Sequence, residues 1–554
     1  MKLKSLPRIH APLLTFGASV FLVLLCNFSF WKTFVAATGG AKIGNLPLYL
    51  GASLVLVLVF NLILTLVNFR LLIKPVLIFL FLVTSSASYF MSKYGVVIDA
   101  SMVQNVVETD VREATELLSW NMVETVLLLG VLPSIIVWRL PVQFPPLRRD
   151  LLIKLSTIAG SALVVVGLLM LLFKTLAPAV REHREMRFLL TPTNVFQATN
   201  SYLKQRFAVP TVVAPLGTDA TKGRLWAAAG AGAGVAGQGK HAVTIIVVGE
   251  TARAMNFSLN GYERETNPNL KKEQGLINFT NVSSCGTATA VSVPCVFSDL
   301  PREDYSEDKA RAQEGLLDVL RHAGFEVLWR DNNSGCKGVC DRVKFEDLSQ
   351  PVAGDKLCNS EECFDERLLN GLPEMIRNAQ KDMIIVLHQK GSHGPAYWKR
   401  YPAEFNKFTP VCQTNELEKC SRESIVAAYD NTILYTDFFL SRAIDVLRKA
   451  AAEGGADTSL LYFSDHGESL GEKNMYLHGA PYMFSPAEQR KVPMMLWMSD
   501  GFSERFKVDR ACLAARSGQE FSHDNVFHST LGMLNVNTAV YNPKLDIFHA
   551  CVRG

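Results

Sequence analysis

Five apolar runs near the N-terminus constrain this 554-residue chain more than any other feature. They are Pro12–Trp31, Leu46–Asn68, Leu71–Phe90, Met122–Trp138 and Leu155–Phe173. A helix needs about 20 apolar residues to cross the hydrocarbon core of a bilayer, where it satisfies its own backbone hydrogen bonds. We therefore expect a transmembrane domain of five helices over residues 1–175.

Positive charge in the short connections predicts the orientation, because cytoplasmic loops carry an excess of Lys and Arg. The N-terminus and the second-to-third and fourth-to-fifth connections carry Lys2, Lys4, Arg8, Arg70, Lys74, Arg139, Arg148, Arg149 and Lys154. The N-terminus is thus expected in the cytoplasm. Everything after Phe173 is expected outside, which in a Gram-negative cell is the periplasm.

Cysteine spacing agrees with that orientation. Eight of the 11 cysteines form the close pairs Cys285/Cys295, Cys336/Cys340, Cys358/Cys363 and Cys412/Cys420. Close pairs are typical of disulfides formed in an oxidising compartment. Zinc bound by these cysteines is the alternative. It is disfavoured because such sites often include histidine ligands, and His322 is the only histidine near the pairs. Pairing between sequence neighbours is the simplest choice.

A segment between the third and fourth runs has its own pattern. Apolar residues recur at helical spacing from Val103 to Ser119, which predicts an amphipathic helix on the outer membrane face. Asn105, Thr109 and Glu113 are four residues apart and share one stripe of this helix. An ordinary solvated face would give the same stripe.

The region from 176 to 240 predicts a bridge between two domains. Leu176–Phe207 is basic and contains Pro178 and Pro192, so we expect it to be broken and to rest on the lipid surface. Trp226–Gly239 is a Gly/Ala sequence typical of flexible linkers. A soluble domain then begins at residue 241 and extends to 554.

Short apolar strands alternate with helical stretches in this soluble domain. The predicted strands are Val243–Val248, Glu326–Trp329, Met383–Leu387, Ser459–Phe463 and Val492–Met498. The predicted helices include Asp318–Ala323 and Ser424–Glu453. This alternation indicates an α/β domain built around a mostly parallel sheet.

Polar candidates follow three of these strands. Glu250 follows the first, His388 and His393 follow the third, and Asp465 and His466 follow the fourth, with His478 a short loop later. Ligands bind beyond the carboxyl ends of strands in such sheets, so we expect these side chains at one edge. Carboxylate and imidazole ligands of this mix suit zinc.

The loop between Cys285 and Cys295 supplies a candidate nucleophile. Thr287 and Thr289 are the hydroxyls near its centre, and we favour Thr289. Metal coordination lowers the pKa of an alcohol, and the alkoxide can attack phosphorus. Phosphoryl transfer also requires that the negative charge on the phosphoryl oxygens is neutralised. Asn333 and Lys337 are candidates for this role.

Three long motifs carry a resemblance to a known family. GETARAMNFSLNGYERETNP, SCGTATAVSVPC and SDHGESLGE with the later YLHGAP resemble the phosphoethanolamine transferases that modify lipid A, which include the plasmid-borne colistin-resistance enzymes. The resemblance covers essentially the whole chain. It implies five membrane helices and a periplasmic domain of the alkaline phosphatase/sulfatase type.

The resemblance also implies roles for individual residues. The zinc ligands would be Glu250, Thr289, Asp465 and His466, with Thr289 as the nucleophile in place of Thr287. The phosphoethanolamine group would contact Asn105, Thr109, Glu113, Ser334, Lys337, His393 and His478. His393 and His478 are candidates for acid–base catalysis and for a second zinc ion. The disulfides would join neighbouring pairs, followed by Cys512 with Cys551.

The implied reaction is a ping-pong transfer within the inner membrane. Phosphatidylethanolamine is the donor, diacylglycerol leaves, and a lipid A phosphate accepts the group from Thr289. The added ammonium would offset negative charge and weaken polymyxin binding. We expect a monomer that contacts membrane lipid. The net charge of +4 gives no case for nucleic-acid binding.

Other functions fit parts of this pattern. The acceptor could instead be a core Kdo or heptose, or a periplasmic glucan. A sulfatase would need a Cys/Ser-x-Pro-x-Arg motif, which Val293–Phe297 does not supply, and a phosphatase would not need five spans. A phosphoglycerol transferase fits the chemistry but matches the motifs less well. A non-catalytic membrane scaffold or sensor would not need the metal-ligand set.

Overall fold

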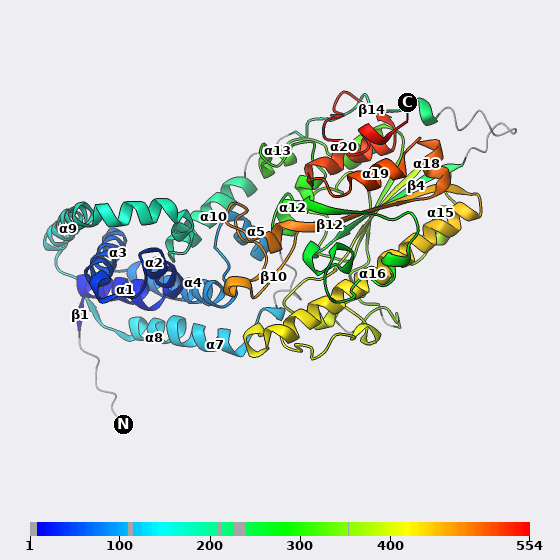
Figure 1. The fold of residues 1–554 in the computed structure, drawn as a ribbon. Helices are drawn as coiled ribbons and strands as arrows, with labels where there is room; N and C mark the ends of the chain where they lie inside the picture. Colours follow the sequence, from blue (N-terminus) through cyan, green and yellow to red (C-terminus); the bar gives the residue numbers. More distant parts are fainter. Residues whose placement is uncertain are drawn as a thin grey trace. The chain divides into compact units, whose positions relative to one another are not determined.

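The computed structural model describes residues 8–108, 115–207, 212–226, 240–352, 354–359 and 361–553 (Figure 1). The chain forms two compact units. The first unit, called the membrane unit here, comprises Met1–Val103 and Leu118–Tyr202. The second, called the catalytic unit, comprises Gln104–Leu117 and Leu203–Gly554.

Apolar helices build the membrane unit. They are α1 (Ala11–Leu25), α2 (Phe28–Ala37), α3 (Leu46–Leu66), α4 (Ile73–Tyr94), α7 (Trp120–Val126), the π-helical η2 (Leu127–Val131), α8 (Leu132–Arg139) and α9 (Leu147–Glu182). Among the described residues, four helical stretches are long and apolar enough to cross a membrane, and there are five if α1 and α2 form one broken span.

The first expected span is not a continuous helix. Its two parts, α1 and α2, meet at a bend of 62°. At the break, the buried Asn27 side chain donates hydrogen bonds to the carbonyls of Leu22 (2.9 Å) and Thr191 (2.8 Å). A side chain that replaces backbone partners in this way lets a membrane helix bend without leaving polar groups unpaired.

One expectation about the membrane unit is wrong. Pro178 was expected to break the basic segment, yet α9 continues for 36 residues and ends at Glu182. A proline removes one backbone donor, and a helix of this length tolerates the loss of a single hydrogen bond.

An eight-stranded sheet forms the centre of the catalytic unit, in the order β13-β5-β12-β9-β4-β8-β6-β7. The strands are β4 (His241–Gly249), β5 (Ile277–Ser283), β6 (Glu326–Asp331), β7 (Lys344–Asp347), β8 (Met383–His388), β9 (Ala456–Ser464), β12 (Lys491–Met498) and β13 (Phe521–Ser522). Only β12 runs antiparallel to its neighbours, so the sheet is mostly parallel as expected.

Apolar cores lie on both faces of this sheet. In β4, Ile246 and Val248 belong to one core, and Val243, Ile245 and Val247 belong to the other. Successive strand residues point to opposite faces, so a strand buried on both faces is apolar throughout. Helix α16 (Arg422–Ala452) packs into the second core, and α14 (Leu316–His322) into the first.

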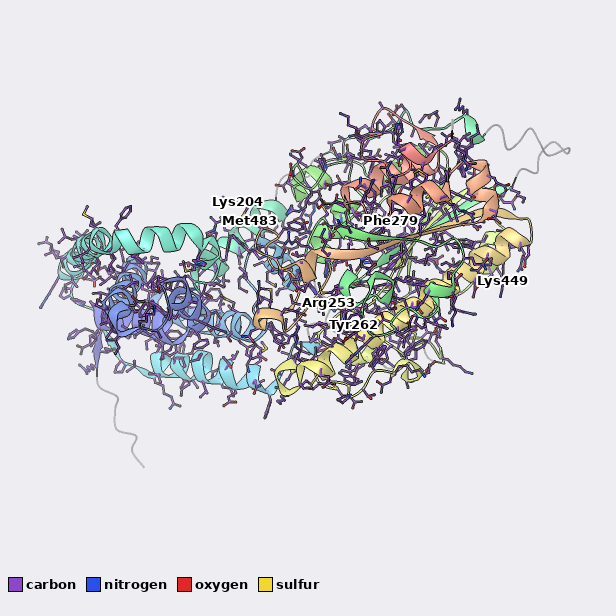
Figure 2. All side chains as sticks on the ribbon, in the orientation of Figure 1. Lys204, Arg253, Tyr262, Phe279, Lys449 and Met483 are labelled. Carbon is purple, nitrogen blue, oxygen red and sulfur yellow. A yellow bond between two sulfur atoms is a disulfide. The ribbon has the colours of Figure 1, made fainter. Side chains whose placement is uncertain are left out.

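The five expected strands and both expected helices are present, but three other strands of this sheet were not expected. In β5, Phe279 is 1% exposed and packs edge-on against Phe521 of β13, with ring centroids 5.6 Å apart (Figure 2). The remaining missed strand, β7, lies at the other edge of the sheet. Edge strands are short and polar, so local periodicity indicates them poorly.

Five disulfides stiffen the catalytic unit. They join Cys285–Cys295, Cys336–Cys340, Cys358–Cys363, Cys412–Cys420 and Cys512–Cys551. These are the pairs that the resemblance implies. Within the described part of the chain, Cys26 is the free cysteine, and it is buried.

Candidate active site

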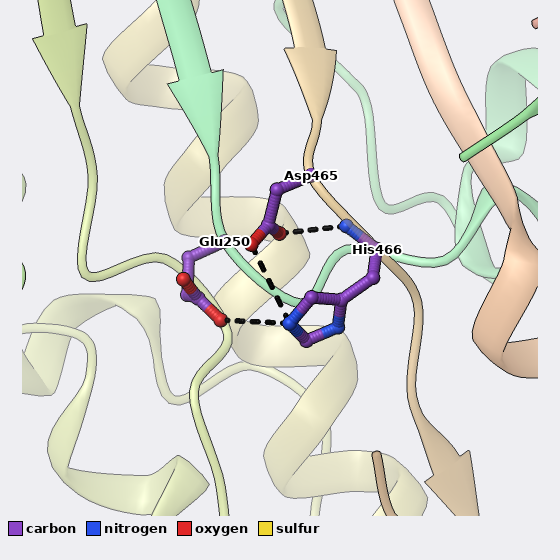
Figure 3. A group of neighbouring side chains, drawn as sticks. All are labelled: Glu250, Asp465 and His466. Carbon is purple, nitrogen blue, oxygen red and sulfur yellow. Dashed lines mark hydrogen bonds and ion pairs between the residues drawn. The ribbon is translucent and has the colours of Figure 1, made fainter. Parts of the chain in front are cut away.

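Two neighbouring parallel strands carry the centre of the site. Glu250 follows β4, and Asp465 and His466 follow β9. The three side chains are fully buried, and one potential ligand atom from each lies within 4.8 Å of the other two. Their acidic and imidazole groups converge on one point (Figure 3). Adjacent parallel strands end at the same edge, which explains the convergence of residues more than 200 positions apart.

Thr289 completes this cluster from a different element. It is the first residue of α12 (Thr289–Val296), within the loop closed by Cys285 and Cys295. Its Oγ1 lies 3.0 Å from Oε2 of Glu250 and 3.3 Å from Nε2 of His466. The N-terminus of a helix carries partial positive charge, which favours a bound phosphate. Thr289 is half-buried, whereas the other three residues are sealed, so it is the accessible member.

Hydrogen bonds from surrounding residues fix the two carboxylates. Asn333 Nδ2 donates to Oε2 of Glu250 (2.8 Å), and the backbone N–H of Thr251 donates to Oδ1 of Asp465 (3.1 Å). The α12 residue Ser292 donates its hydroxyl to the carbonyl of Asp465 (2.6 Å). These partners restrict the rotamers of the cluster, as a preorganised site requires.

The cluster has the electrostatics of a cation site. The buried Oδ2 of Asp465 has no hydrogen-bond partner among the described residues, although His466 Nε2 lies 3.4 Å away. Burial would lower the pKa of His466, but the carboxylates of Asp465 and Glu250 raise it to about 10. Burial and the charge of Glu250 raise the pKa of Asp465 to about 6. Two buried carboxylates with a spare oxygen fit a metal ion.

Glu250 remains the most acidic member of the cluster. Burial would raise the pKa of its carboxyl group, but the hydrogen bond with His466 and the charge of that imidazole hold the pKa well below its usual value. Its carboxylate is therefore available as a ligand at neutral pH.

A second pair of imidazoles lies beside the cluster. The ring of His478 is centred 4.4 Å from that of His466 and 5.4 Å from that of His393. His478 Nδ1 lies 2.8 Å from Oε2 of Glu468, and Oε1 of Glu468 accepts a hydrogen bond from the Tyr397 hydroxyl (2.5 Å). Glu468 thus orients the ring of His478, and Nε2 is the ring nitrogen that faces away from Glu468. Sequence reasoning missed Glu468, although it lies three residues after Asp465 in SDHGESLGE.

The loop after β6 carries Ser334 and Lys337, which are predicted to contact the phosphate group. Lys337 Nζ donates to the carbonyl (3.1 Å) and hydroxyl (3.0 Å) of Ser334. Both residues line a cavity of about 610 Å³ that also reaches Ala290, next to Thr289. Asn333 was expected to contact phosphate, and here its amide binds Glu250. Lys337, Ser334 and the first turn of α12 therefore line the same cavity.

A buried pair behind Asn333 was also missed. His388 was considered as a ligand, but its Nδ1 lies 2.7 Å from Oδ1 of Asp331 and its Nε2 lies 3.3 Å from the Asn333 amide. The charge of Asp331 and their hydrogen bond raise the pKa of His388 against the effect of burial. This pair therefore supports Asn333, outside the three-residue cluster. Asp331 at the end of β6 was the available sequence signal.

The three residues expected on the amphipathic helix are described only in part. Asn105 lies in α5 (Ala100–Glu108) and is half-buried. Thr109 and Glu113 lie outside the described residues. Residues 104–117 belong to the catalytic unit, although membrane helices precede and follow them in the sequence.

The fold and the site together define a class of enzyme. A mostly parallel sheet carries a candidate metal cluster at its carboxyl edge with a hydroxyl beside it, which suits phosphoryl or sulfuryl transfer. Residues 242–536 match the sulfatase family. Residues 56–207 match the family described as phosphoethanolamine transferase EptA/EptB.

Comparison with individual proteins narrows the class to one family. Phosphoethanolamine transferase EptA of Escherichia coli strain K12 is 40% identical over 538 residues, which are 97% of this chain and 96% of that protein. Phosphatidylethanolamine transferase Mcr-1 of Escherichia coli is 40% identical over 495 residues, covering 87% and 88% of the two chains. The chain belongs to the phosphoethanolamine transferase family and is a transferase.

A solved structure supports the same conclusion over both units. The integral membrane protein lipooligosaccharide phosphoethanolamine transferase A from Neisseria meningitidis matches with a TM-score of 0.92 and 34% identity, covering 99% of this chain and 100% of that one. The apolar helices and this likeness make the chain a multi-pass membrane protein.

Proposed function

We propose that this protein transfers phosphoethanolamine from phosphatidylethanolamine to a phosphate group of lipid A. The observation that carries the proposal is the position of Thr289 Oγ1, within 3.3 Å of both Glu250 and His466 at the start of a helix. A hydroxyl in this position can accept a phosphoryl group next to a cation site. Family membership supplies the identity of the transferred group.

Glu250, Asp465, His466 and Thr289 would hold a zinc ion, because two carboxylates, an imidazole and a hydroxyl suit that metal. Bound zinc would supply positive charge that favours ionised threonine and polarises the phosphoryl group. We propose one tightly held ion, with His393 and His478 as the site of a second.

The first half-reaction forms a bond between Thr289 Oγ1 and phosphorus and breaks the bond to the diacylglycerol oxygen. Glu250 accepts the hydrogen bond of the threonine hydroxyl, and the N–H groups at the start of α12 stabilise the phosphoryl oxygens. Lys337 and Ser334 neutralise the same charge from the neighbouring cavity. Thr289 loses one proton in this step and the leaving oxygen gains one, which is donated by His478, oriented by Glu468, or by His393.

The second half-reaction returns Thr289 to its free state. A lipid A phosphate oxygen attacks the phosphoethanolamine-threonine, and the threonine oxygen leaves. Asn105, Thr109 and Glu113 are proposed to contact the ethanolamine end of the group. The product carries an added ammonium, which lowers the negative charge of the outer membrane and weakens the binding of cationic peptides such as polymyxins.

Location follows from the substrates and the sequence. We propose that the protein lies in the Gram-negative inner membrane as a monomer, with its N-terminus in the cytoplasm and its catalytic unit in the periplasm. The basic connections and the five disulfides support this orientation, because disulfides form in the periplasm.

Mass spectrometry of lipid A tests the proposal. The wild type and Thr289→Ala are expressed in a susceptible Gram-negative host that lacks its own lipid A phosphoethanolamine transferases. Lipid A that gains one phosphoethanolamine only with the wild type supports the donor group, the acceptor and the nucleophile together. Unmodified lipid A together with modified core sugar or glucan would identify that sugar or glucan as the acceptor instead of lipid A. No modification of any of these by folded protein would favour a non-catalytic role.

A further inference from the structure

Arg400 is a buried arginine that connects three separate segments of the catalytic unit. Its side chain is 1% exposed. Its Nε donates to the carbonyl of His393 (2.8 Å), its Nη2 donates to Oε2 of Glu116 (2.5 Å), and its Nη1 donates to Glu362. Three of the donor groups of one guanidinium thus bind three partners that are distant in sequence.

Each partner lies in a segment with its own place in the fold. His393 lies in the loop that follows β8 and leads into the active site. Glu362 lies in the loop closed by Cys358 and Cys363. Glu116 lies near the end of residues 104–117, the part of the catalytic unit that is inserted between membrane helices in the sequence.

The other end of residues 104–117 has an anchor as well. Gln104 is 3% exposed, and its Nε2 donates to Oε1 of Glu307 (3.0 Å) at the start of α13 (Glu307–Arg311). The two anchors, Gln104 and Glu116, therefore bracket the positions at 105, 109 and 113 that are proposed to contact the ethanolamine group.

The chemistry of Arg400 suits a joint of this kind. A guanidinium is planar, always charged, and holds several acceptors in fixed directions, which an ammonium group does not. Glu116 and Glu362 are only 11% and 13% exposed, so removing the arginine would leave two largely buried carboxylates without their cation. The joint is consequently stiff.

We propose that Arg400 is a positioning residue that holds Glu116 beside the loop of His393, so that His393 meets the donor headgroup in one geometry. The proposal rests on the proposed function, because it assigns donor binding to His393. Arg400 acts through these two elements and does not itself touch the reacting atoms.

Two substitutions test this role. Glu116→Gln keeps the shape of the side chain but removes its charge, and it leaves the bonds of Arg400 to His393 and Glu362 in place. Arg400→Lys keeps a positive charge but lacks the planar guanidinium that directs donors to the three segments. Arg377→Gln is the matched control, because Arg377 pairs with Glu453 at 3.8 Å on the surface, where both side chains are about 60% exposed.

The expected result is a loss of donor binding with the fold intact. For Glu116→Gln, kcat/KM for a phosphatidylethanolamine donor in mixed micelles should fall on the order of 10- to 100-fold, mainly through KM, because a small misplacement of binding groups is costly. Arg400→Lys should lose at least as much. Arg377→Gln should match the wild type, and the melting temperature of Glu116→Gln should stay close to the wild-type value.

Hydrogen–deuterium exchange supplies a readout that does not depend on turnover. Both test variants should exchange faster than the wild type at residues 115–117, and Arg400→Lys also at 392–394, while β4 and β9 keep their protection. Faster exchange spread over the whole catalytic unit would reduce Arg400 to general stabilisation and overturn the proposal. Unchanged KM in Glu116→Gln would overturn it too.

The two tests separate this proposal from the proposed function. If the wild type transfers no phosphoethanolamine, the proposed function fails, and with it the assigned donor geometry. The exchange measurement would still show whether Arg400 joins the segments. If the wild type is active and Glu116→Gln behaves like Arg377→Gln, only the positioning role fails.

Discussion

The two units place the same apolar residue types in opposite ways. In α9 of the membrane unit, Leu163 is 77% exposed and Leu171 is 80% exposed. Only 6% of the most apolar stretch of this helix is buried within the protein. In β4 of the catalytic unit, every residue from Val243 to Val248 is 0% exposed. The difference follows from the solvent, because lipid accepts apolar side chains and water does not.

Buried polar groups differ between the units in the same manner. In the membrane unit, Asn27 and Thr191 bond to each other and to backbone carbonyls at the bend between α1 and α2. In the catalytic unit, Glu250, Asp465 and His466 are buried charged groups in which the imidazole lies 3.4 Å from each carboxylate, and the two carboxylates also accept hydrogen bonds from neighbouring residues. Buried polar groups satisfy backbone hydrogen bonds in the membrane unit, whereas in the catalytic unit they form the candidate active site.

Removing the nucleophile should give the largest effect and should leave both units folded. Thr289→Ala deletes the only atom that is proposed to form a bond to phosphorus, so transfer should fall by more than about 10³-fold. Thr289→Ser keeps a hydroxyl and should retain measurable transfer. Lipid A mass spectrometry and a covalent phosphoethanolamine adduct on the purified protein are the measurements, with the melting temperature as the check on folding.

An alanine variant that still modified lipid A would show that another residue attacks. Thr287 is the nearest alternative, but its hydroxyl donates to the carbonyl of Ala480 (2.6 Å) and it is 7% exposed. Thr287→Ala should therefore keep the adduct on Thr289, although the loop could lose stability.

Removing a metal ligand tests whether the buried charges serve a cation. Asp465→Asn keeps the shape of the side chain and removes the charge beside the unpartnered oxygen. Metal affinity should fall on the order of 100-fold or more, and activity should fall with it. The metal content of the purified protein gives the result, and zinc added after chelation should restore the wild type but not the variant.

If Asp465→Asn bound zinc as tightly as the wild type, the cluster would be a structural ion network rather than a metal site. A matched control is Asp546→Asn, which changes another buried aspartate of the catalytic unit and should keep its metal content. Burial raises the pKa of Asp546 to about 6, as it does for Asp465, so burial alone does not distinguish the two.

Sequence patterns predict those parts of the molecule in which all residues of a segment have the same surroundings. The apolar runs of the membrane unit and the β-branched run at Val243–Val248 both follow from uniform surroundings. The positions of Glu250 and Asp465 after strands followed from the rule for parallel sheets, and the structure brings them together.

Features that depend on distant contacts could not be predicted in this way. The bend at Asn27 depends on a partner 164 residues away, and β5 is completed by β13 from near the C-terminus. Glu468 and Asp331 act through the imidazoles of His478 and His388, which approach them only in the folded chain. No local periodicity carries that information.

A glycine next to Glu250 should separate effects on the site from effects on the fold. Gly391 has a φ of +54°, and a Cβ there would lie 2.6 Å from the carbonyl oxygen of Glu250. Gly391→Ala must move that backbone, so transfer should fall on the order of 10- to 100-fold. Gly261 also has a positive φ (+91°) but has nothing within 4 Å. Gly261→Ala should cost about 1 kcal/mol of stability and leave kcat unchanged.

Equal activity in the two alanine variants would mean that the site adapts to backbone movement at Glu250. Measured rates and urea or thermal unfolding of both variants decide between these outcomes. The expected contrast is a rate defect at Gly391 and a purely thermodynamic defect at Gly261.

A corresponding pair in the membrane unit tests packing in lipid. A Cβ at Gly130 would lie 2.6 Å from Oγ of Ser85 and 3.3 Å from Cδ2 of Leu82, both on α4. Gly130→Leu should therefore destabilise the unit by about 1–3 kcal/mol through overpacking. Gly160 has nothing within 4 Å, so Gly160→Leu should be nearly neutral in α9. Thermal unfolding followed by size-exclusion chromatography in detergent gives the comparison, and equal losses would contradict it.

The last expected effect concerns the acid stability of the catalytic unit and appears only below about pH 6.5. Burial lowers the pKa of His528 from 6.5 to about 4, and its Nδ1 accepts a hydrogen bond from the backbone of Asn542 (3.2 Å). The unfolded chain binds this proton below about pH 6.5, whereas the folded chain does not until about pH 4. Stability is therefore lost as the pH falls through this window, by about 1.4 kcal/mol per pH unit and by about 2–3 kcal/mol in total. His528→Asn offers an oxygen to the same N–H but cannot take up the proton, so its stability should fall less between pH 6.5 and 4. Denaturant unfolding of both proteins across this range measures the difference, and parallel curves would show that His528 is not the group that titrates.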